Sequence, residues 1–274
     1  MIKNLIICAD DYSQNNDICE GILLLAKNKK INAISCMAST ANWHETHLAL
    51  NPFKDKIYLG LHLNLTLGKA LSSKWKETYS LNFNNLPTLI KQCYLGRLDK
   101  ECVEAEIHTQ IDAFRDAMGI NPDFIDGHQH IHQLPIIREA LLSVYKQKKL
   151  SAFFRKTCSD WSDLLAYANF PKRQAITLLG GLAFKRLLRQ DAILTNTSFA
   201  GIYNFVNAKN YGYYFKQFLK SSMTGGLIMC HPGMESADPS DPLYQYRHFE
   251  LNYFMSTAFQ KDLKSEQCQL IQKP

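Results

Sequence analysis

The chain has 274 residues, of which 46% are hydrophobic and 20% charged, a composition typical of a folded globular protein rather than a disordered chain. Its 31 basic and 25 acidic residues give a net charge of +6, but they are scattered and form no basic motif, so no nucleic-acid partner is expected. No apolar segment is long enough for a transmembrane helix, and the start at 1–4 leaves no room for a secretory signal, which predicts a cytoplasmic location.

Short apolar segments alternate with longer segments of helical periodicity, a pattern typical of parallel β/α units. Helices are predicted at 17–29, 100–118 and 134–149, with a last helical pattern at 249–264. The segment 69–98 lacks clear periodicity and is predicted to be an insertion of the kind that forms substrate walls. Seven strands are predicted, at 5–9, 33–37, 57–63, 123–126, 152–155, 192–194 and 227–230.

The predicted units follow one another without a linker rich in Gly, Ser or Pro, so a single domain over residues 1–274 is expected. Seven β/α units favour an α/β fold of the TIM-like (β/α) barrel type, seven-stranded and therefore distorted, and a doubly wound open sheet is the alternative. The eight cysteines include no C-x-x-C pair and are expected mostly to be reduced core residues. An aromatic-rich stretch at 211–215 would allow a homodimer.

Residues that can carry chemistry stand at the ends of the predicted strands. In a β/α barrel these strand ends lie on one face, where the loops build the active site, so residues far apart in sequence are expected to converge. They are Asp10 and Asp11 after the first strand, His62 late in the third, the run DGHQHIH at 126–132 after the fourth, Arg155 at the end of the fifth and His231 after the last.

One carboxylate and two imidazoles from different strands form a suitable three-ligand set for a divalent metal that keeps a position open for water. We assign Asp11, His62 and His128 to this set. Asp10 is adjacent to a ligand and is the candidate base that deprotonates the attacking water, and His231 is the candidate acid that protonates a leaving group. The expected cofactor is one divalent metal ion, magnesium or zinc, because a mixed oxygen and nitrogen site suits several metals.

Each of these residues also has a structural alternative. Two adjacent aspartates after a strand more often cap the next helix, and His62 on an apolar strand could be a hydrogen-bonded core residue. His128, His130 and His132 alternate after an acidic residue, a pattern with little structural purpose, but the three are spaced too far apart to reach one ion together. His130 and His132 are therefore expected to orient ligands or to contact substrate.

Four motifs, taken together in their order and spacing, resemble the YdjC-like carbohydrate deacetylases, which include chitooligosaccharide and hopanoid-associated deacetylases. They are ADDY at 9–12, GLHLNLT at 60–66, DGHQHIH at 126–132 and HPG at 231–233. The resemblance implies a TIM-like barrel of the glycoside hydrolase/deacetylase superfamily. It also implies an Asp-His-His metal site that removes acetyl groups from N-acetylated sugars.

Carried onto the matching positions, the resemblance implies Asp11, His62 and His128 as metal ligands and Asp10 as base. It likewise implies His231 as proton donor to the departing amine.

Three further residues are expected near the substrate. Arg155 stands where related deacetylases often place an arginine near the base, and Tyr12 and Trp43 are candidates for stacking on a sugar ring. Thr197 stands where an acidic residue is common in the family, a departure that bears on substrate identity rather than on the chemistry.

The expected activity is the metal-dependent hydrolysis of the N-acetyl group of an amino sugar or oligosaccharide, with release of acetate. One alternative is a metal-dependent amidohydrolase or phosphoesterase acting on a lipid- or nucleotide-linked sugar. A non-catalytic carbohydrate-binding protein is a further alternative, but it would need neither Asp10 nor His231.

Overall fold

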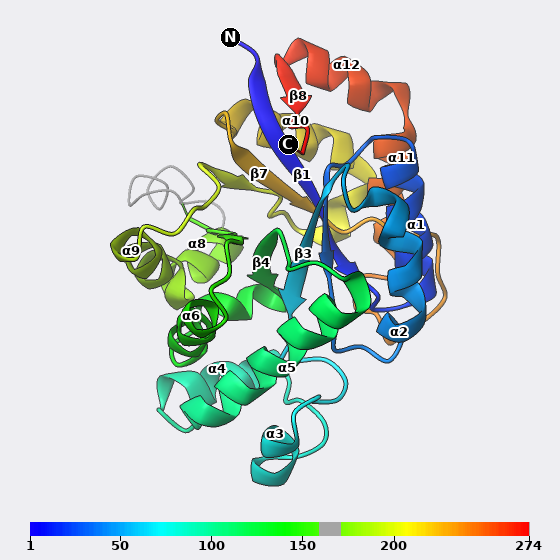
Figure 1. Cartoon of the computed structure of the whole chain (residues 1–274). Helices are drawn as coiled ribbons and strands as arrows, with labels where there is room; N and C mark the ends of the chain where they lie inside the picture. The colour runs from blue at the N-terminus through cyan, green and yellow to red at the C-terminus, as the bar shows by residue number, and fades with distance from the viewer. Residues whose placement is uncertain (159–170, 274) are drawn as a thin grey trace.

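The computed structural model describes residues 1–158 and 171–273 of the chain. Over these residues, seven parallel strands form one sheet in the order β5-β4-β3-β2-β1-β7-β6, and the sheet curls into a partial barrel with helices on its outer surface (Figure 1). The predicted fold class is thereby confirmed. A short eighth strand pairs with the amino-terminal end of β1. The strands are β1 (Lys3–Tyr12), β2 (Ala33–Cys36), β3 (Tyr58–Leu63), β4 (Phe124–Gly127), β5 (Phe153–Phe154), β6 (Phe199–Ala200), β7 (Gly226–Cys230) and β8 (Cys268–Leu270).

Helices connect the strands, and the longest of those described, α5, has the predicted bounds 100–118. Its amino end is capped by the Asp99 side chain, which accepts the Cys102 N–H, and its carboxyl end stops at Gly119, whose φ of 69° suits glycine. The helices are α1 (Asn16–Lys27), α2 (Trp43–Thr46), η1 (His47–Phe53), α3 (Ser73–Thr78), α4 (Leu86–Tyr94), α5 (Lys100–Met118), η2 (His128–Gln133), α6 (Ile137–Gln147), α8 (Pro171–Ile176), η3 (Thr177–Gly181), α9 (Leu182–Gln190), η4 (Phe205–Asn210), α10 (Tyr211–Ser221), α11 (Arg247–Met255) and α12 (Thr257–Ser265).

The predicted sixth strand, at 192–194, is wrong, because β6 lies five residues later. Ala192 has a φ of 52° and turns the chain after α9, so the apolar residues there end a helix instead of forming a strand. Leu194 is 73% exposed, whereas Phe199 is buried against β7. The remaining predicted strands overlap observed strands, with ends shifted by at most three residues, the largest shift being at the carboxyl end of β1.

The segment between α9 and β6 bridges the two edges of the sheet. The Phe154 N–H of β5 donates to the Leu194 carbonyl (2.9 Å), and the Leu227 N–H of β7 donates to the Ser198 carbonyl (2.9 Å). Between these points, the Asn196 side chain bonds to both the N–H and the carbonyl of Lys156. These contacts connect the two edges of the partial barrel where β5 and β6 do not pair, and they distinguish the fold from an open doubly wound sheet.

A small apolar core fills the inside of the curled sheet, and a larger one lies between the strands and the outer helices. The inner core contains Cys8, Phe124 and Met229, contributed by three different strands. A Cβ atom at position 60 would overlap the Phe124 ring, so Gly60 of β3 makes room for this ring inside the barrel. The cysteines are buried and reduced, as predicted.

The last helical pattern, at 249–264, is two helices rather than one. Ser256 between α11 and α12 has an extended backbone (φ −76°, ψ 164°), and its side chain accepts the Ala258 N–H to cap α12. Strand β8 was not predicted, because three residues are too few to show strand alternation.

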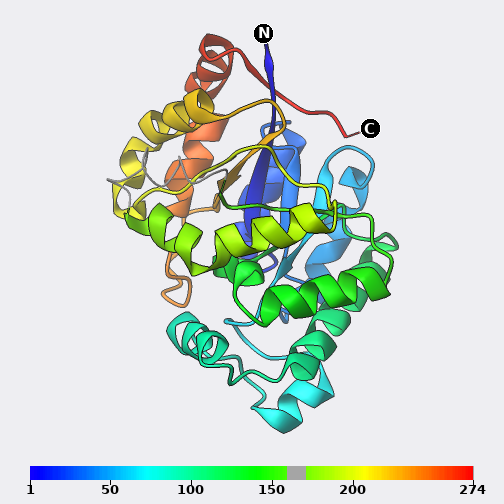
Figure 2. The ribbon, with the colours of Figure 1, turned by 90° about the vertical axis from the view of Figure 1, so that its left-hand side faces the viewer.

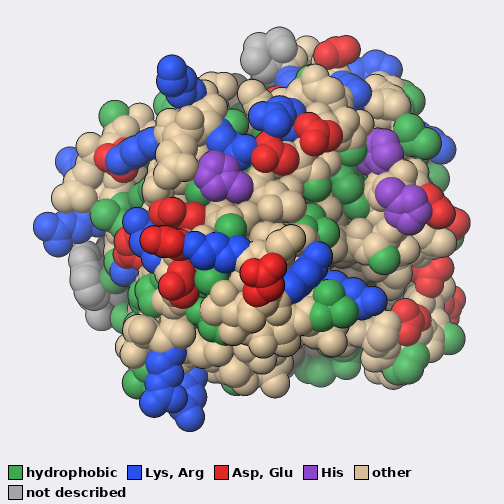
Figure 3. Space-filling model, turned by 60° about the horizontal axis from the view of Figure 1, so that its bottom comes forward, with side chains coloured by type: hydrophobic (Ala, Val, Ile, Leu, Met, Phe, Trp, Pro, Cys, Tyr) green, Lys and Arg blue, Asp and Glu red, His purple; other side chains and the backbone are tan. Residues whose placement is uncertain are grey.

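The predicted insertion at 69–98 forms α3 and α4, which begin after the N-caps Ser72 and Asn85. It lies beyond the carboxyl ends of the strands (Figures 1 and 2). On this face acidic and basic side chains are interspersed (Figure 3). None of the helices described is both long enough and apolar enough to cross a membrane.

Candidate metal centre and active site

The carboxyl ends of the strands surround a cavity of about 610 Å³. Most of the site residues predicted from the sequence line this cavity, although they come from β1, β3, η2 and the end of β7. The nominated residues that line it are Asp10, Asp11, His62, His128, His130 and His231.

A bulge at the end of β1 allows both adjacent aspartates to face the cavity. Alternate residues of a strand point to opposite faces, so Asp10 follows Cys8 into the barrel and Asp11 would be directed outward. The pairing of β1 with β2 shifts register between Ala9 and Tyr12, and Asp11 adopts a left-handed φ of 67°. This local distortion turns the second carboxylate back to the same site, where strained backbone is often found.

Asp11, His62 and His128 lie together as the sequence predicted. Asp11 Oδ1 is 2.9 Å from His128 Nδ1 and 3.3 Å from His62 Nε2, and the three potential ligand atoms lie within 4.8 Å of one another. One carboxylate oxygen and two imidazole nitrogens at this separation suit a divalent metal ion.

Asp126 orients His62 toward this cluster. His62 Nδ1 donates to Asp126 Oδ1 (2.6 Å), which leaves Nε2 facing Asp11, and Ser35 donates to the same carboxylate oxygen (2.5 Å). A carboxylate behind an imidazole is the usual support of a metal-binding histidine. Burial lowers the pKa of His62, but Asp126 and Asp11 raise it to about 10, so a metal ion binding here would displace a proton. The residues present therefore fit a metal ion.

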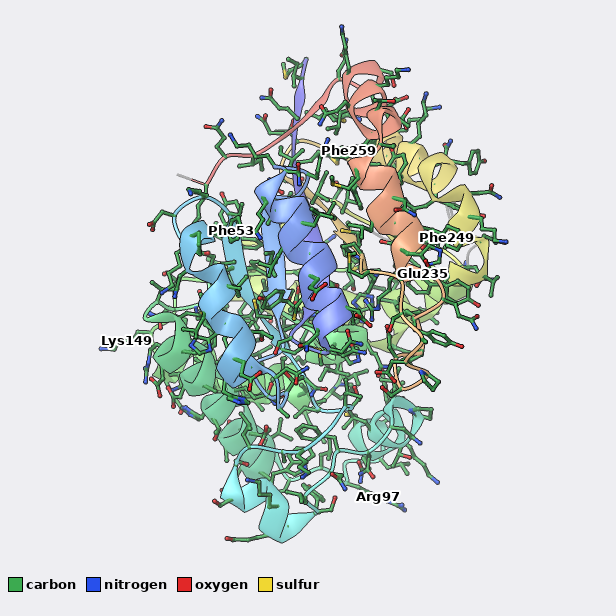
Figure 4. All side chains as sticks on the ribbon, turned by 90° about the vertical axis from the view of Figure 1, so that its right-hand side faces the viewer. Phe53, Arg97, Lys149, Glu235, Phe249 and Phe259 are labelled. Atoms are coloured by element: carbon green, nitrogen blue, oxygen red, sulfur yellow. The ribbon has the colours of Figure 1, made fainter. Side chains whose placement is uncertain are left out.

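Arg247 of α11 holds the other oxygen of Asp11. Its Nη2 is 2.9 Å from Asp11 Oδ2, and Asp241 fixes the same guanidinium at 2.6 and 3.0 Å. Burial by itself raises the pKa of Asp11, but Arg247 and His128 hold it well below its usual range. The Asp11 carboxylate is thus ionised, with Oδ1 facing the two imidazoles. Glu235 and Phe249 in Figure 4 mark the segment after β7 and helix α11, which together carry Asp241 and Arg247.

Asp10 is paired with Arg155, as the resemblance implied. The guanidinium contacts both oxygens of Asp10 at 2.6 Å and reaches Asp126 Oδ2 at 2.6 Å, and Arg155 is fully buried. Burial raises the pKa of Asp10, but Arg155 lowers it to about 2, so this carboxylate is ionised at neutral pH. His231 Nε2 lies 4.0 Å from Asp10 Oδ2.

His130 and His132 differ in their surroundings. His130 lines the cavity, has a left-handed φ of 61°, and its buried Nδ1 has no hydrogen-bond partner within the described part of the chain. His132 is fully buried, its Nε2 bonds to the Arg155 carbonyl (3.0 Å), and its ring packs edge-on against Phe184. His130 therefore faces the cavity, whereas His132 fixes the backbone of β5 at Arg155.

Tyr12 and Trp43 do not fit the predicted role of stacking on a sugar. Tyr12 is fully buried and its hydroxyl donates to the Thr46 carbonyl (2.7 Å). Trp43 is 5% exposed, stacks on Phe114, and donates from Nε1 to the Ala113 carbonyl. Both rings are enclosed by protein outside the cavity and pack the core instead.

Asp126, Arg247 and Glu250 were missed as site residues. The sequence could have indicated Asp126, because it directly precedes the histidine cluster. Arg247 and Glu250 lie in an ordinary helical stretch that carries no such indication. Glu250 accepts the backbone N–H of His231 (2.7 Å) and the Tyr203 hydroxyl (2.7 Å), so it fixes the backbone of the candidate acid.

Replacing Glu250 with glutamine is expected to remove a pH dependence of stability. Burial raises the pKa of Glu250 from 4.5 to about 7, although its hydrogen bonds and Arg247 lower it. Between these two pKa values the folded state keeps a proton that the unfolded state releases, so stability falls as pH rises. The loss reaches about 3 kcal/mol above pH 7. Urea unfolding of both proteins from pH 4 to 8 measures it.

The Glu250→Gln variant should match the wild type at pH 4 and be more stable at pH 8. Parallel stability curves for the two proteins would show that Glu250 does not carry the proton.

Comparison with known proteins places these features in a family. The family described as "YdjC-like protein" matches residues 4–265. A carbohydrate deacetylase from Danio rerio is 28% identical over 144 residues, covering 51% of this chain and 45% of that protein. A carbohydrate deacetylase from Clostridium beijerinckii is 29% identical over 151 residues (53% and 58%), and a chitooligosaccharide deacetylase from Yersinia pestis is 27% identical over 151 residues (55% and 58%). The matched region spans about half the length of these relatives.

A solved structure shares the fold over nearly the whole chain. It is described as a candidate cellobiose-phosphate cleavage protein from Enterococcus faecalis, and it superposes with a TM-score of 0.73 at 17% identity, covering 99% of this chain and 97% of that one. The family match extends from β1 into α12 and includes every nominated site residue. The chain therefore belongs to the YdjC-like protein family.

Proposed function

We propose that the protein is a metal-dependent hydrolase that removes the N-acetyl group from an amino sugar or oligosaccharide and releases acetate. The observation that carries the proposal is the meeting of Asp11, His62 and His128 in one cavity beside the Asp10–Arg155 pair and His231. The names of the deacetylase relatives support the choice of an N-acetylated sugar as substrate.

Asp11, His62 and His128 would hold the metal ion. When bound, a divalent ion supplies positive charge that polarises the acetyl carbonyl and acidifies water. Asp10 then accepts a proton from the attacking water, because Arg155 keeps this carboxylate ionised and fixes both of its oxygens. The carbon–nitrogen bond of the amide breaks, and acetate and the free amine are the products.

We assign to His231 the delivery of the proton to the departing nitrogen. Burial lowers the pKa of His231 to about 4, so its imidazole is neutral at pH 7 and must first acquire a proton. The carboxylate of Asp10 lies 4.0 Å from His231 Nε2. The proton that Asp10 takes from water can pass to His231 and from there to the amine.

Metal removal tests the proposal. The full chain, incubated with N-acetylglucosamine oligomers, is expected to release acetate, to lose this activity after dialysis against a chelator, and to regain it with magnesium or zinc. Acetate is measured by an enzyme-coupled assay. Phosphate release from generic phosphoesters, without acetate release from the oligomers, would instead support the phosphoesterase alternative.

A further inference from the structure

Two side chains of the cavity each keep one polar atom without a hydrogen-bond partner. Gln14 and Arg247 both line the cavity. Within the described part of the chain, Gln14 Oε1 and Arg247 Nη1 are buried and bond to no other atom. A buried polar atom that stays unpaired is destabilising, so such atoms at a cavity indicate where a ligand is expected to pair with the protein.

Asp241 fixes both side chains. Its Oδ1 accepts from Gln14 Nε2 (3.4 Å) and from Arg247 Nη2 (3.0 Å), and its Oδ2 accepts from Arg247 Nε (2.6 Å). An ionised carboxylate only accepts, so the amide nitrogen of Gln14 faces Asp241 and the amide oxygen is left free. Nε and Nη2 form one edge of the guanidinium, so Nη1 is not directed at Asp241. One free acceptor and one free donor are thus held on side chains that contact the same carboxylate oxygen.

This pair adjoins the candidate metal ligand Asp11. The backbone N–H of Gln14 donates to the Asp11 carbonyl (3.0 Å), closing a turn in which Ser13 has a φ of 79°. Arg247 Nη2 is 2.9 Å from Asp11 Oδ2, whereas Oδ1 of the same carboxylate faces the two imidazoles. We call Gln14 Oε1 and Arg247 Nη1 the hydroxyl site. It lies one carboxylate group away from the place where the amide of the substrate would react.

A single hydroxyl group matches the hydroxyl site, because it both donates and accepts a hydrogen bond. It can donate to Gln14 Oε1 and accept from Arg247 Nη1. An ether oxygen or an anion only accepts, and it would leave the Gln14 oxygen unpaired. The charge of Arg247 is also already balanced by Asp11 and Asp241, which weakens its attraction for an anion. The chemistry of the site therefore favours a neutral hydroxyl group.

The position of the hydroxyl site beside Asp11 selects among the hydroxyl groups of an N-acetylated sugar. In N-acetylglucosamine the C3 hydroxyl is on the ring carbon next to the one that carries the amide, whereas the C6 hydroxyl is on the other side of the ring. The C1 oxygen of a glycoside carries no hydrogen to donate. A hydroxyl that is close to the amide and has a hydrogen is therefore the C3 hydroxyl.

We propose that Gln14 and Arg247 bind the C3 hydroxyl of the sugar that carries the N-acetyl group, so that the protein selects N-acetylated amino sugars in which this hydroxyl is free. The inference rests on the proposed function and narrows its substrate class. It excludes sugars whose C3 oxygen is an ether, such as N-acetylmuramic acid, in which that oxygen also carries a carboxylate-bearing group. Gln14 and Arg247 determine specificity here and transfer no proton.

Four sugars test the proposal on the unaltered protein. The full chain is titrated calorimetrically with the methyl glycosides of N-acetylglucosamine, of its 3-deoxy and 6-deoxy analogues, and of N-acetylmuramic acid. We expect the 3-deoxy sugar and the muramic acid glycoside to bind at least about tenfold more weakly than N-acetylglucosamine, and the 6-deoxy sugar to bind as well. Equal binding of the parent and the 3-deoxy sugar, a loss confined to the 6-deoxy sugar, or no binding of any of the four would overturn the proposal.

A variant of Gln14 tests the residue itself. Gln14→Met keeps the length of the side chain and removes its amide, so it should bind the parent sugar about tenfold more weakly and no longer distinguish it from the 3-deoxy sugar. The matched control is Gln269→Met on β8, where the amide donates to Asn4 (2.7 Å) near the amino end of β1, and it should keep the wild-type ratio. If Gln14 were only structural, its loss would weaken both sugars equally, and an unchanged ratio would contradict the assignment.

Acetate release from the same sugars separates this inference from the proposed function. If the expected binding pattern is found but no sugar is deacetylated, the proposed hydrolysis fails while the hydroxyl site stands. If the parent and the 3-deoxy sugar are deacetylated with equal kcat/KM and bind equally, the hydroxyl site fails while the proposed function stands.

Discussion

Replacing Asp10 with asparagine is expected to lower kcat for acetate release by about 10³-fold while the protein still binds one divalent ion. The amide of the variant cannot take a proton from water, but it keeps an acceptor oxygen for Arg155, which remains paired with Asp126. The ligand set of Asp11, His62 and His128 is not altered. Acetate release and metal content by atomic emission are measured on the same preparation.

The matched control is the same substitution at the neighbouring residue. Asp11→Asn removes the ligand charge from a site in which Asp11 Oδ1 faces both imidazoles, so it should lose the metal as well as the activity. If instead Asp10→Asn lost the metal and Asp11→Asn retained it, the base and the ligand would have to be exchanged. The two variants can be compared directly, because the bulge at Asp11 gives two adjacent and chemically identical side chains different partners.

The largest expected effect on stability comes from Arg155→Met. Arg155 is fully buried and pairs with Asp10 and Asp126, so the substitution removes the close cation of Asp10 and leaves Asp126 with His62 and Ser35 alone. Removing one partner of a buried ion pair costs about 3–5 kcal/mol, because the remaining charge is neither solvated nor compensated. Urea unfolding followed by circular dichroism measures the free energy of unfolding.

Two further variants check the reason for this loss. Arg115→Met breaks an ion pair with Asp112 in which the arginine side chain is 47% exposed, and it should cost less than about 1 kcal/mol. Arg155→Met combined with Asp10→Asn should recover part of the stability, since the carboxylate that lost its cation is then neutral. Equal losses for Arg155→Met and Arg115→Met would mean that water reaches the buried carboxylates.

The sequence predicted a helix or strand correctly where the residues that define its ends lie within the element or next to it. Helix α5 has a capping Asp99, nineteen helical residues and a terminating Gly119, and its bounds were predicted without error. The strand predicted at 192–194 failed because a short apolar run after a helix can also be the end of that helix, and periodicity cannot separate the two over three residues.

The same distinction applies to the candidate site. Asp11, His62 and His128 were nominated because polar residues at the ends of parallel strands must share one face of a barrel, which is a rule of topology that a sequence can reveal. Tyr12 and Trp43 were nominated for their aromatic rings alone. Ring chemistry does not say whether a side chain faces a cavity or the core, and both face the core.

The sequence by itself thus determined the order of β/α units and predicted the clustering of Asp11, His62 and His128 beside Asp10. Only the tertiary structure decided that Arg247 neutralises Asp11 and that Glu250 holds the backbone of His231. Arg247 and Asp11 are 236 residues apart in the chain, and Glu250 meets the His231 N–H only because α11 packs beside the end of β7. No local periodicity encodes them, because they depend on how the outer helices pack.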